Sequence, residues 1–327
     1  MGYCEFCYNP FAYISDTGRI MSYTNIHEQA APITRNWREL AKMASVLFKA
    51  RVVSLLLVSS VAGAFLSAGG WPGFAPLFGV IIAGGLAAGG ASALNQYIER
   101  DKDKKMSRTR QRPLPTGEII DQDWVPVVGI NMIVLPSIFV APFNPALAFF
   151  LLLGAFIYVV VYTIWLKPRT LLNIVIGGAA GSAAVLSGAA AAGNWTSPGV
   201  LVLALILFLW TPSHFWSLAI LYRDDYKKAN IPMLPTIMSE RNASWWVMSH
   251  TLPTAIGAVL LAVVPELGWV YAVLVIAFSA DMVRRNVTLI RKPTLKNARR
   301  FFISSNVYLL VVLLGICIDS VIMSFLG

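Results

Sequence analysis

Three side chains with oxygen donors recur at four-residue spacing in the stretch ALNQYIERDKDKKMSRTRQRPLPTG, residues 93–117. They are Asn95, Glu99 and Asp103, and they directly follow an apolar run. A helix that continues through this stretch places all three on one face, because residues four apart are neighbours on a helix surface. Such oxygens suit Mg²⁺, which proteins bind through carboxylates together with substrate phosphates.

Seven basic side chains follow within the same stretch, so groups for holding a metal and groups for holding phosphate would lie side by side. That combination suits a magnesium-bridged diphosphate, in which acids hold the metal and bases hold the phosphates. The alternative interpretation is a charged loop that contains several salt bridges. The spacing alone does not decide between a magnesium–diphosphate site and such a loop.

A second acidic and basic cluster lies within WTPSHFWSLAILYRDDYKKANIPMLP, residues 210–235. Asp224 and Asp225 stand there among three basic residues, where an apolar run ends. Ionisable groups at the end of a membrane helix are usually functional. Lys167 and Arg169 are the only charged residues in another connection between the two clusters. We therefore expect both clusters to face each other at one membrane surface.

The elements that must position these residues are membrane helices. Of 327 residues, 57% are hydrophobic and only 13% are charged, about half the charged fraction of soluble proteins. The apolar runs are continuous rather than alternating, which favours helices over strands, and most reach the roughly 20 residues that cross a bilayer. The fold class predicted is all-α and polytopic. The nine runs lie near 46–66, 73–97, 122–142, 144–166, 171–193, 197–221, 244–264, 267–283 and 301–326.

The basic residues predict the orientation of this bundle. All 26 lysines and arginines lie before the first run, at its leading edge (Lys49 and Arg51), or in every second connection. Nine spans place all of those segments on one side, and the positive-inside rule makes that side the cytoplasm.

The N-terminal segment, residues 1–45, is predicted to be a separate cytoplasmic part that precedes a transmembrane domain at 46–327. It contains no apolar core of the length that a signal peptide needs. The stretch WRELAKMASVLF, residues 37–48, is typical of an amphipathic helix that lies on a membrane surface. Cys4 and Cys7 form a CxxC pair, which without a second pair or a nearby histidine is weak evidence for a metal site.

Three blocks of the chain resemble the UbiA-type intramembrane prenyltransferases, and most closely the branch that farnesylates haem. Residues 95–103 resemble the family's first aspartate-rich motif, NxxxDxxxD. Residues 99–117 are similar to DRDxDxxMxRTxxRPLPxG, residues 162–181 to YTxxLKRxTxxNIVIGGxxG, and residues 210–235 to WxPPHFWxLAIxxxxDYxxAxxPMLP. The blocks follow one another in the family's order.

The resemblance implies a helical bundle around a central cavity and an Mg²⁺-dependent reaction. Farnesyl diphosphate ionises, a vinyl group of haem B captures the allylic cation, and water adds to give haem O and diphosphate. It further implies a multi-pass protein of the cell inner membrane, with its active site facing the cytoplasm. The implied partners are the lipid bilayer and, at the protein level, haem A synthase or terminal oxidase assembly proteins; nucleic acid is not among them.

The resemblance also implies roles for individual residues. The positions implied for metal binding and catalysis are Asn95, Glu99, Asp103 and Asp225. The positions implied for substrate binding are Arg100, Lys104, Lys167, Arg169, His214 and Asp224. His214 lies within an apolar run, where a neutral imidazole can ligate haem iron. A hydrogen-bonded packing histidine is the alternative interpretation for that residue.

The chain departs from the family pattern at several positions. Glu99 stands where aspartate is usual, Pro168 where arginine is frequent, and Ser213 where a proline precedes the histidine. Glu99 can still bind a metal, and Pro168 removes one phosphate contact. Ser213 and the stretch GSAAVLSGAA, residues 181–190, which replaces the family's GAxPPxxGWAA, lie on the walls of the fifth and sixth spans, so they put the acceptor in question more than prenyl transfer. The alternatives are therefore a UbiA-type enzyme that prenylates an aromatic quinone precursor and, from a different class, a membrane transporter with a midplane site. Asp281, within the eighth run, is expected to pair with nearby arginines rather than with a substrate.

Overall fold

The computed structural model describes residues 12–14, 20–22 and 36–326. The chain divides into two compact units, Met1–Ala44 and Ser45–Gly327. The predicted CxxC pair at positions 4 and 7 lies outside the described residues.

The first unit contains a short hairpin and most of a helix. Strands β1 (Ala12–Ile14) and β2 (Ile20–Ser22) pair antiparallel, with Tyr13 opposite Met21. Helix α2 (Trp37–Leu47) occupies the stretch where the amphipathic helix is expected, and it reaches into the second unit. Its binding to a membrane surface stays a prediction.

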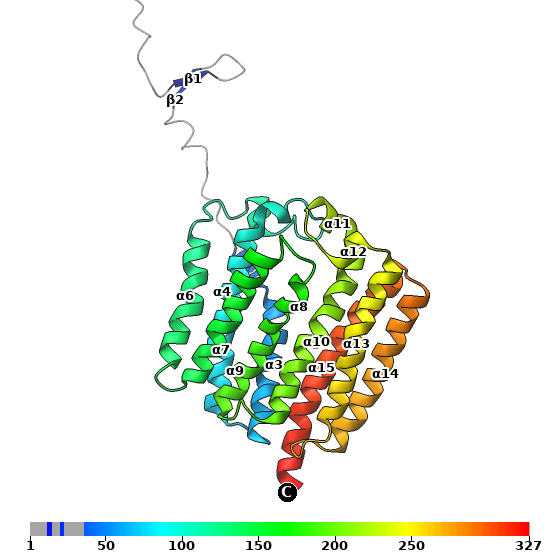
Figure 1. Cartoon of the computed structure of the whole chain (residues 1–327). Coiled ribbons are helices and arrows are strands. Elements are labelled where there is room, and N and C mark those ends of the chain that lie inside the picture. Colours follow the sequence, from blue (N-terminus) through cyan, green and yellow to red (C-terminus); the bar gives the residue numbers. More distant parts are fainter. Residues whose placement is uncertain (1–11, 15–19, 23–35, 327) are drawn as a thin grey trace, which may run out of the picture. The chain divides into compact units, whose positions relative to one another are not determined.

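The second unit is built from helices alone in the part that the structure describes (Figure 1). Its longer helices are α3 (Ala50–Ala68), α4 (Phe74–Asp103), α6 (Trp124–Val140), α7 (Pro145–Phe156), α9 (Ala179–Ala192), α10 (Pro198–Leu221), α13 (Glu240–Leu261), α14 (Trp269–Arg291) and α15 (Leu295–Leu326). Its shorter elements are α5 (Pro113–Thr116), the π-helix η1 (Ile157–Leu166), α8 (Asn173–Gly177), α11 (Arg223–Lys228) and α12 (Leu234–Ile237). The predicted all-α fold is confirmed for this unit.

Six helices or continuous helix pairs are long and apolar enough to cross a membrane, so the chain is a multi-pass membrane protein. They are Ala50–Ala68, Phe74–Asp103, Pro145–Leu166, Asn173–Ala192, Pro198–Leu221 and Leu295–Leu326. Helix α6 is apolar but has 17 residues, and α14 carries Asp281, Arg284 and Arg285 within five positions. The nine predicted runs all fall on helices, but the count of nine spans stays a prediction.

Small residues let two of the central helices pack backbone to backbone. Helix α3 lies against α9, and the Ser60 hydroxyl donates to the Ala184 carbonyl over 2.7 Å. A Cβ built on Gly188 would stand 1.7 Å from the Ser60 carbonyl oxygen, so no larger residue fits there without moving a helix. Close approach of this kind is the usual role of small residues in membrane bundles.

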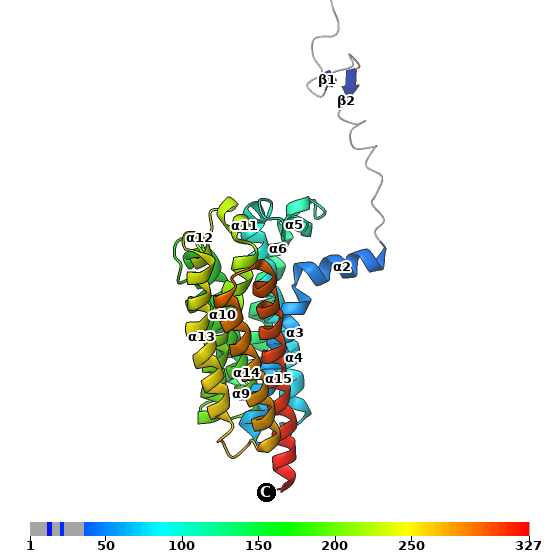
Figure 2. The same ribbon diagram turned by 90° about the vertical axis from the view of Figure 1, so that its right-hand side faces the viewer.

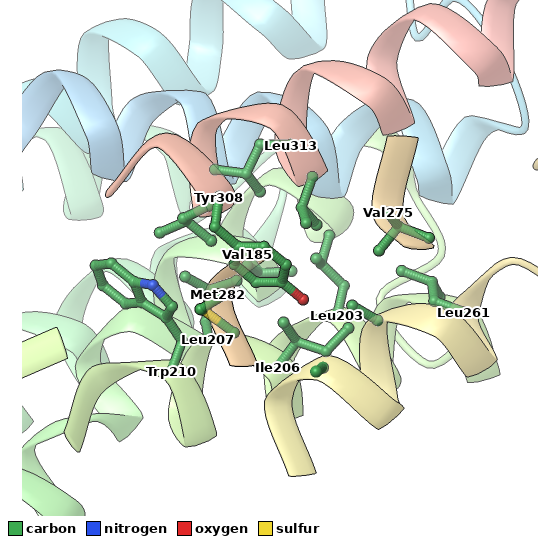
Figure 3. Close-up of a cluster of buried hydrophobic side chains, with 14 of the residues drawn as sticks. Val185, Leu203, Ile206, Leu207, Trp210, Leu261, Val275, Met282, Tyr308 and Leu313 are labelled. Carbon is green, nitrogen blue, oxygen red and sulfur yellow. The ribbon is translucent and has the colours of Figure 1, made fainter. Parts of the chain in front are cut away.

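A hydrophobic cluster joins α9, α10, α13, α14 and α15 (Figure 3). Leu203 and Ile206 of α10 are fully buried in it, and Trp210 of the same helix is also a buried member. The Trp210 indole N–H donates to the Ser305 carbonyl over 2.9 Å, which ties α10 to α15 within the cluster.

The short helices gather at one end of the bundle. Figures 1 and 2 both show α5, α11 and α12 beyond the same ends of the long helices. Helix α4 ends there at Asp103, α10 ends there at Leu221, and η1 ends at Leu166 just before Lys167. The charged connections of the sequence therefore meet at this end.

Candidate active site

Helix α4 presents the first acidic motif on one face. The helix runs without a break from Phe74 to Asp103, which confirms that Asn95, Glu99 and Asp103 stack at four-residue spacing. Their exposed fractions are 2%, 4% and 4%, and that of Asp225 on α11 is 8%. Four polar side chains so deeply buried at a helix end must be paired, because isolated buried charges are very costly.

Glu99 is paired with a lysine from a neighbouring element. The Lys167 ammonium lies 2.6 Å from both oxygens of the Glu99 carboxylate and donates its hydrogen bond to Oε2, so Oε1 takes part in the ion pair but accepts no hydrogen bond from a described residue. The Asn95 amide donates to the same Oε2 and to the Thr163 hydroxyl, both over 3.0 Å. Oε1 is thus a buried carboxylate oxygen with capacity for a further ligand.

The π-helix η1 sets the position of the residues around Glu99. Its wider turn shows in the bonds from Lys167 N to the Tyr162 carbonyl, 2.8 Å, and from the Thr163 hydroxyl to the Tyr158 carbonyl, 2.7 Å, which both span five residues. This register directs Thr163 to Asn95 and Lys167 to Glu99. π-Helical turns are frequent at functional sites.

Lys49 is a site residue that the sequence analysis missed. It stands just before α3 in a left-handed backbone conformation, with φ 49°, which is uncommon for a residue other than glycine. Its ammonium donates to the Asn95 side-chain oxygen over 2.5 Å and to the Tyr158 hydroxyl over 2.9 Å. In the sequence it is one of many basic residues at the end of an apolar run, so no spacing singled it out.

The two buried lysines differ electrostatically. Burial, together with the Arg112 guanidinium nearby, lowers the pKa of Lys49 to about 7. Burial also opposes the charge on Lys167, but the adjacent Glu99 carboxylate outweighs it and raises the pKa of Lys167 above its ordinary value. Lys167 is therefore a permanent cation, whereas the charge on Lys49 depends on what binds beside it.

The segment after α4 joins the two acidic clusters. Arg112 donates to the Asp103 carboxylate over 2.6 Å. Four residues after Asp103, the Ser107 hydroxyl donates to the Asp225 carboxylate over 2.6 Å, and Arg108 N approaches the same oxygen at 3.4 Å. The structure therefore places Asp225 of α11 at the same end of the bundle as the α4 motif, as the sequence analysis expects.

An apolar cluster lines the bundle beside these charged groups. Its buried members come from the segment after α4, from η1, α8, α10, α11 and the α11–α12 connection: Met106, Tyr162, Ile174, Ala219, Tyr226, Ala229, Ile231 and Met233. Phe215 of α10 and Tyr222, which directly follows that helix, pack against it. The charged end of the site therefore borders directly on a hydrophobic interior.

Several predicted substrate contacts lie away from this group of buried charges. Arg100 stacks on the Tyr97 ring and donates to the Tyr97 carbonyl. Lys104 forms an exposed ion pair with Asp101 over 3.1 Å.

Two further predicted substrate contacts, Arg169 and Asp224, also lie outside the group of buried charges. Arg169, in the turn after η1, donates to the carbonyls of Ile164 and Trp165 near the end of that helix. The side chain of Asp224 is exposed, whereas its neighbour Asp225 is buried. The predicted roles of these residues in substrate binding stay predictions.

The oxygen donors of the site suit a metal ion whose remaining ligands come from a bound substrate. Among the described residues, no three His, Cys, Asp or Glu side chains lie close enough together to hold a metal ion by themselves. Mg²⁺ needs no such cage, because it usually takes one or two carboxylates together with waters and substrate phosphates. The Glu99 carboxylate and the Asn95 side-chain oxygen have the right chemistry for it, and in this structure the ammonium groups of Lys167 and Lys49 lie against them.

His214 lies deeper, seven residues before the end of α10, or about 10 Å along the axis. Its ring stacks between Trp210 and Phe302, and Nδ1 is 2.8 Å from the Ser305 hydroxyl. It is therefore set back from the carboxylates but on the helix that leads to Asp225.

Two other carboxylates on the long helices have structural partners. Asp281 pairs with Arg284 and Arg285, as expected. Asp319 accepts hydrogen bonds from Gly268 N and Tyr271 N, so it caps the start of α14.

Comparison with known proteins identifies relatives that cover most of this chain. Protoheme IX farnesyltransferase 2 of Paramagnetospirillum magneticum is 40% identical over 280 residues, 85% of this chain and 96% of the relative. Protoheme IX farnesyltransferase of Metallosphaera sedula is also 40% identical over 280 residues, 84% of this chain and 95% of the relative.

Solved structures share the fold. A digeranylgeranylglyceryl phosphate synthase superposes with a TM-score of 0.72 over 86% of this chain and 99% of that one, at 16% identity. A UbiA homologue from Archaeoglobus fulgidus bound to DMAPP and Mg²⁺ superposes with a TM-score of 0.63 over 84% of this chain and 98% of that one, also at 16% identity.

The model of the UbiA prenyltransferase family matches residues 56–311, which include both acidic clusters, η1 and His214. With relatives at 40% identity over most of both chains, this match shows that the chain belongs to the UbiA prenyltransferase family.

Proposed function

We propose that this chain transfers the farnesyl group of farnesyl diphosphate to a vinyl group of haem B and, with addition of water, forms haem O. The observation that carries the proposal is 40% identity, over nearly the whole length of both chains, to relatives named protoheme IX farnesyltransferase. The buried acidic and basic groups at the end of an apolar bundle support it.

The reaction has two bond-forming stages. The C–O bond of farnesyl diphosphate breaks, and diphosphate leaves with the electron pair. The terminal vinyl carbon of haem B then bonds to the allylic cation, and the new cation beside the porphyrin ring takes up water and loses a proton. The products are haem O, diphosphate and one proton.

The buried cations are placed to neutralise charge that develops on the leaving diphosphate. Lys167 and Arg112 are already held by Glu99 and Asp103, and Lys49 by Asn95. Preorganised charges of this kind lower the barrier because they need no reorganisation as the bond breaks. The apolar cluster beside them suits the farnesyl chain and keeps water from the cation.

Asn95, Glu99, Asp103 and Asp225 are the residues that would hold Mg²⁺. The metal would supply positive charge that offsets the negative charge of the leaving diphosphate. Support comes from the buried oxygen donors of α4 and α11 at one end of the bundle, and from solved members of the fold bound to Mg²⁺ together with DMAPP or GPP.

The proposed location is the cell inner membrane, with this end of the bundle in the cytoplasm. The basic connections support that orientation through the positive-inside rule. Haem O is used by haem–copper oxidases directly or after conversion to haem A, so haem A synthase or oxidase assembly proteins are the proposed protein partners.

Chromatography of the haems tests this function. Membranes containing the chain, supplied with haem B, farnesyl diphosphate and Mg²⁺, are expected to produce haem O, and membranes without the chain are not. Asp103→Asn is expected to abolish turnover while the protein still folds. Prenylation of a hydroxybenzoate or naphthoate instead of haem B would overturn the proposal in favour of a quinone-precursor enzyme.

A further inference from the structure

The imidazole of His214 is fixed in one plane by aromatic rings on both faces. The Trp210 ring lies 4.3 Å away at an interplanar angle of 13°, and the Phe302 ring lies 4.5 Å away at 26°. Trp210 is itself held, because its indole N–H donates to the Ser305 carbonyl over 2.9 Å. The ring of His214 can therefore meet a ligand only along its edge.

The hydrogen bonds around Ser305 determine which ring nitrogen carries the proton. The Ser305 hydroxyl donates to the Phe302 carbonyl over 2.8 Å and also lies 2.8 Å from His214 Nδ1. A hydroxyl has a single proton to donate, so towards the imidazole Ser305 is the acceptor. A neutral His214 therefore carries its proton on Nδ1 and a lone pair on Nε2.

Nε2 of His214 is open to a ligand. It forms no hydrogen bond with any described residue, and it is not enclosed within the packed interior. His250 on α13 gives the contrast, because its Nδ1 is both unbonded and enclosed. The lone pair of His214 is thus oriented, unshared and accessible.

We infer that His214 binds the iron of the haem acceptor through Nε2 and that Ser305 is the positioning residue that holds it in the required tautomer. The inference rests on the proposed function for the identity of the acceptor. Histidine ligands of metals usually donate their second N–H to a fixed acceptor, which sets the ring orientation and raises the ligand's basicity. Ser305 supplies that acceptor from α15, so the porphyrin binds where α10 and α15 meet.

The position along α10 is consistent with transfer to a bound porphyrin. Phe215 and Ala219 follow His214 on α10 in the direction of α11, and both contribute to the apolar cluster beside the charged site. Iron held at His214 therefore places the acceptor on the same helix that leads to Asp225.

Binding of ferric haem B alone, without farnesyl diphosphate, to the purified chain in nanodiscs tests the inference. Wild-type protein is expected to give optical and electron paramagnetic resonance spectra of histidine-ligated haem. His214→Phe, which keeps the aromatic stack, is expected to lose that signature, and imidazole added to His214→Gly is expected to restore it. His250→Phe is the matched control and is expected to match wild type.

Ser305→Ala tests the positioning role, with Ser304→Ala on the same helix as its control. Outer partners of metal ligands typically change affinity by 10- to 100-fold, so Ser305→Ala is expected to weaken haem binding about 10-fold or more. The Fe–His stretch of the ferrous complex is expected to shift to lower frequency, because Nδ1–H loses its acceptor. Ser304→Ala, whose hydroxyl bonds to Asp281, is expected to change neither property.

The possible failures are distinct. A histidine signature that persists in His214→Phe, or a wild-type spectrum that shows none, overturns ligation by His214. Wild-type affinity and an unshifted Fe–His stretch in Ser305→Ala overturn the role of Ser305. Haem O production by wild-type protein decides the proposed function separately, because it is measured with farnesyl diphosphate and needs no particular spectrum.

Discussion

At the scale of single residues, the site is organised by buried ion pairs rather than by isolated charges. Glu99 with Lys167 and Asp103 with Arg112 each join an acid of α4 to a base from the following connections. Removing one partner of a buried pair typically costs about 3–5 kcal/mol, because the other charge stays buried without compensation. These side chains are therefore expected to contribute to folding as well as to the proposed substrate binding, and the two contributions can be separated.

A double substitution separates them. Glu99→Gln and Lys167→Met are each expected to lower the free energy of unfolding by about 3 kcal/mol, since each leaves one buried charge unpaired. The double variant is expected to recover much of this loss but none of the prenyl transfer. Thermal unfolding in detergent and haem O formation are the two measurements. Recovery of activity together with stability in the double variant would show that the pair serves only folding.

Lys49 is expected to act on the diphosphate. Lys49→Met removes the amine donor beside Asn95, and the loss of one preorganised hydrogen-bond donor typically lowers turnover on the order of 10²-fold. The exposed Lys296→Met at the start of α15 is the control and should retain activity. Steady-state kinetics with varied farnesyl diphosphate provide the test, and equal rates for the two variants would remove Lys49 from the site.

At the scale of elements, the contact of α3 with α9 depends on the absence of side-chain atoms. Gly188→Ala would place a methyl group against the Ser60 carbonyl, and overpacking of this kind typically costs about 1–3 kcal/mol or more. Gly79→Ala on α4 meets no atom within 4 Å and is the matched control. A lower melting temperature is expected for the first variant alone; equal melting temperatures would contradict the close packing.

Continuity of α4 and the meeting of the two acidic clusters could be predicted, because four-residue spacing and the sidedness of charge are local properties of the sequence. The π-helix could not. A π-helical turn contains about one residue more than an α-helical turn, so the directions of the Thr163 and Lys167 side chains differ from those in an α-helix. No pattern in the apolar sequence YVVVYTIWL indicates that change. The same limit applies to Lys49, whose role depends on a left-handed backbone conformation and on Tyr158, more than 100 residues away.

At the scale of the whole molecule, the basic connections and the short helices share one end of the bundle. Apolar faces of the long helices remain exposed in the isolated chain, as at Phe139, Ile138 and Leu260, which is expected of surfaces that meet lipid. Helix packing therefore determines the fold, and the proposed site lies at the end of the bundle that carries the basic connections. The positive-inside rule predicts that this end faces the cytoplasm, and that orientation can be tested.

Cysteine labelling tests the orientation. In a variant without native cysteines, Lys105→Cys and Lys296→Cys are expected to react with a membrane-impermeant maleimide only from the cytoplasmic side. Asn194→Cys, in the exposed α9–α10 connection, is expected to react only from the opposite side. Labelling of positions 105 and 194 from the same side would contradict the predicted arrangement of spans.

The central claim is that α4 and α11 jointly hold a metal-bridged diphosphate at one end of the bundle. The most direct test is a structure of the chain with Mn²⁺ and a non-hydrolysable farnesyl diphosphate analogue, in which anomalous scattering locates the metal. We predict Mn²⁺ bound by oxygens of the α4 motif and of the diphosphate, with Asp225 contacting the same ion or a second one on the same diphosphate. Metal and diphosphate bound at the other end of the bundle, or bound without either Glu99 or Asp225, would contradict the account.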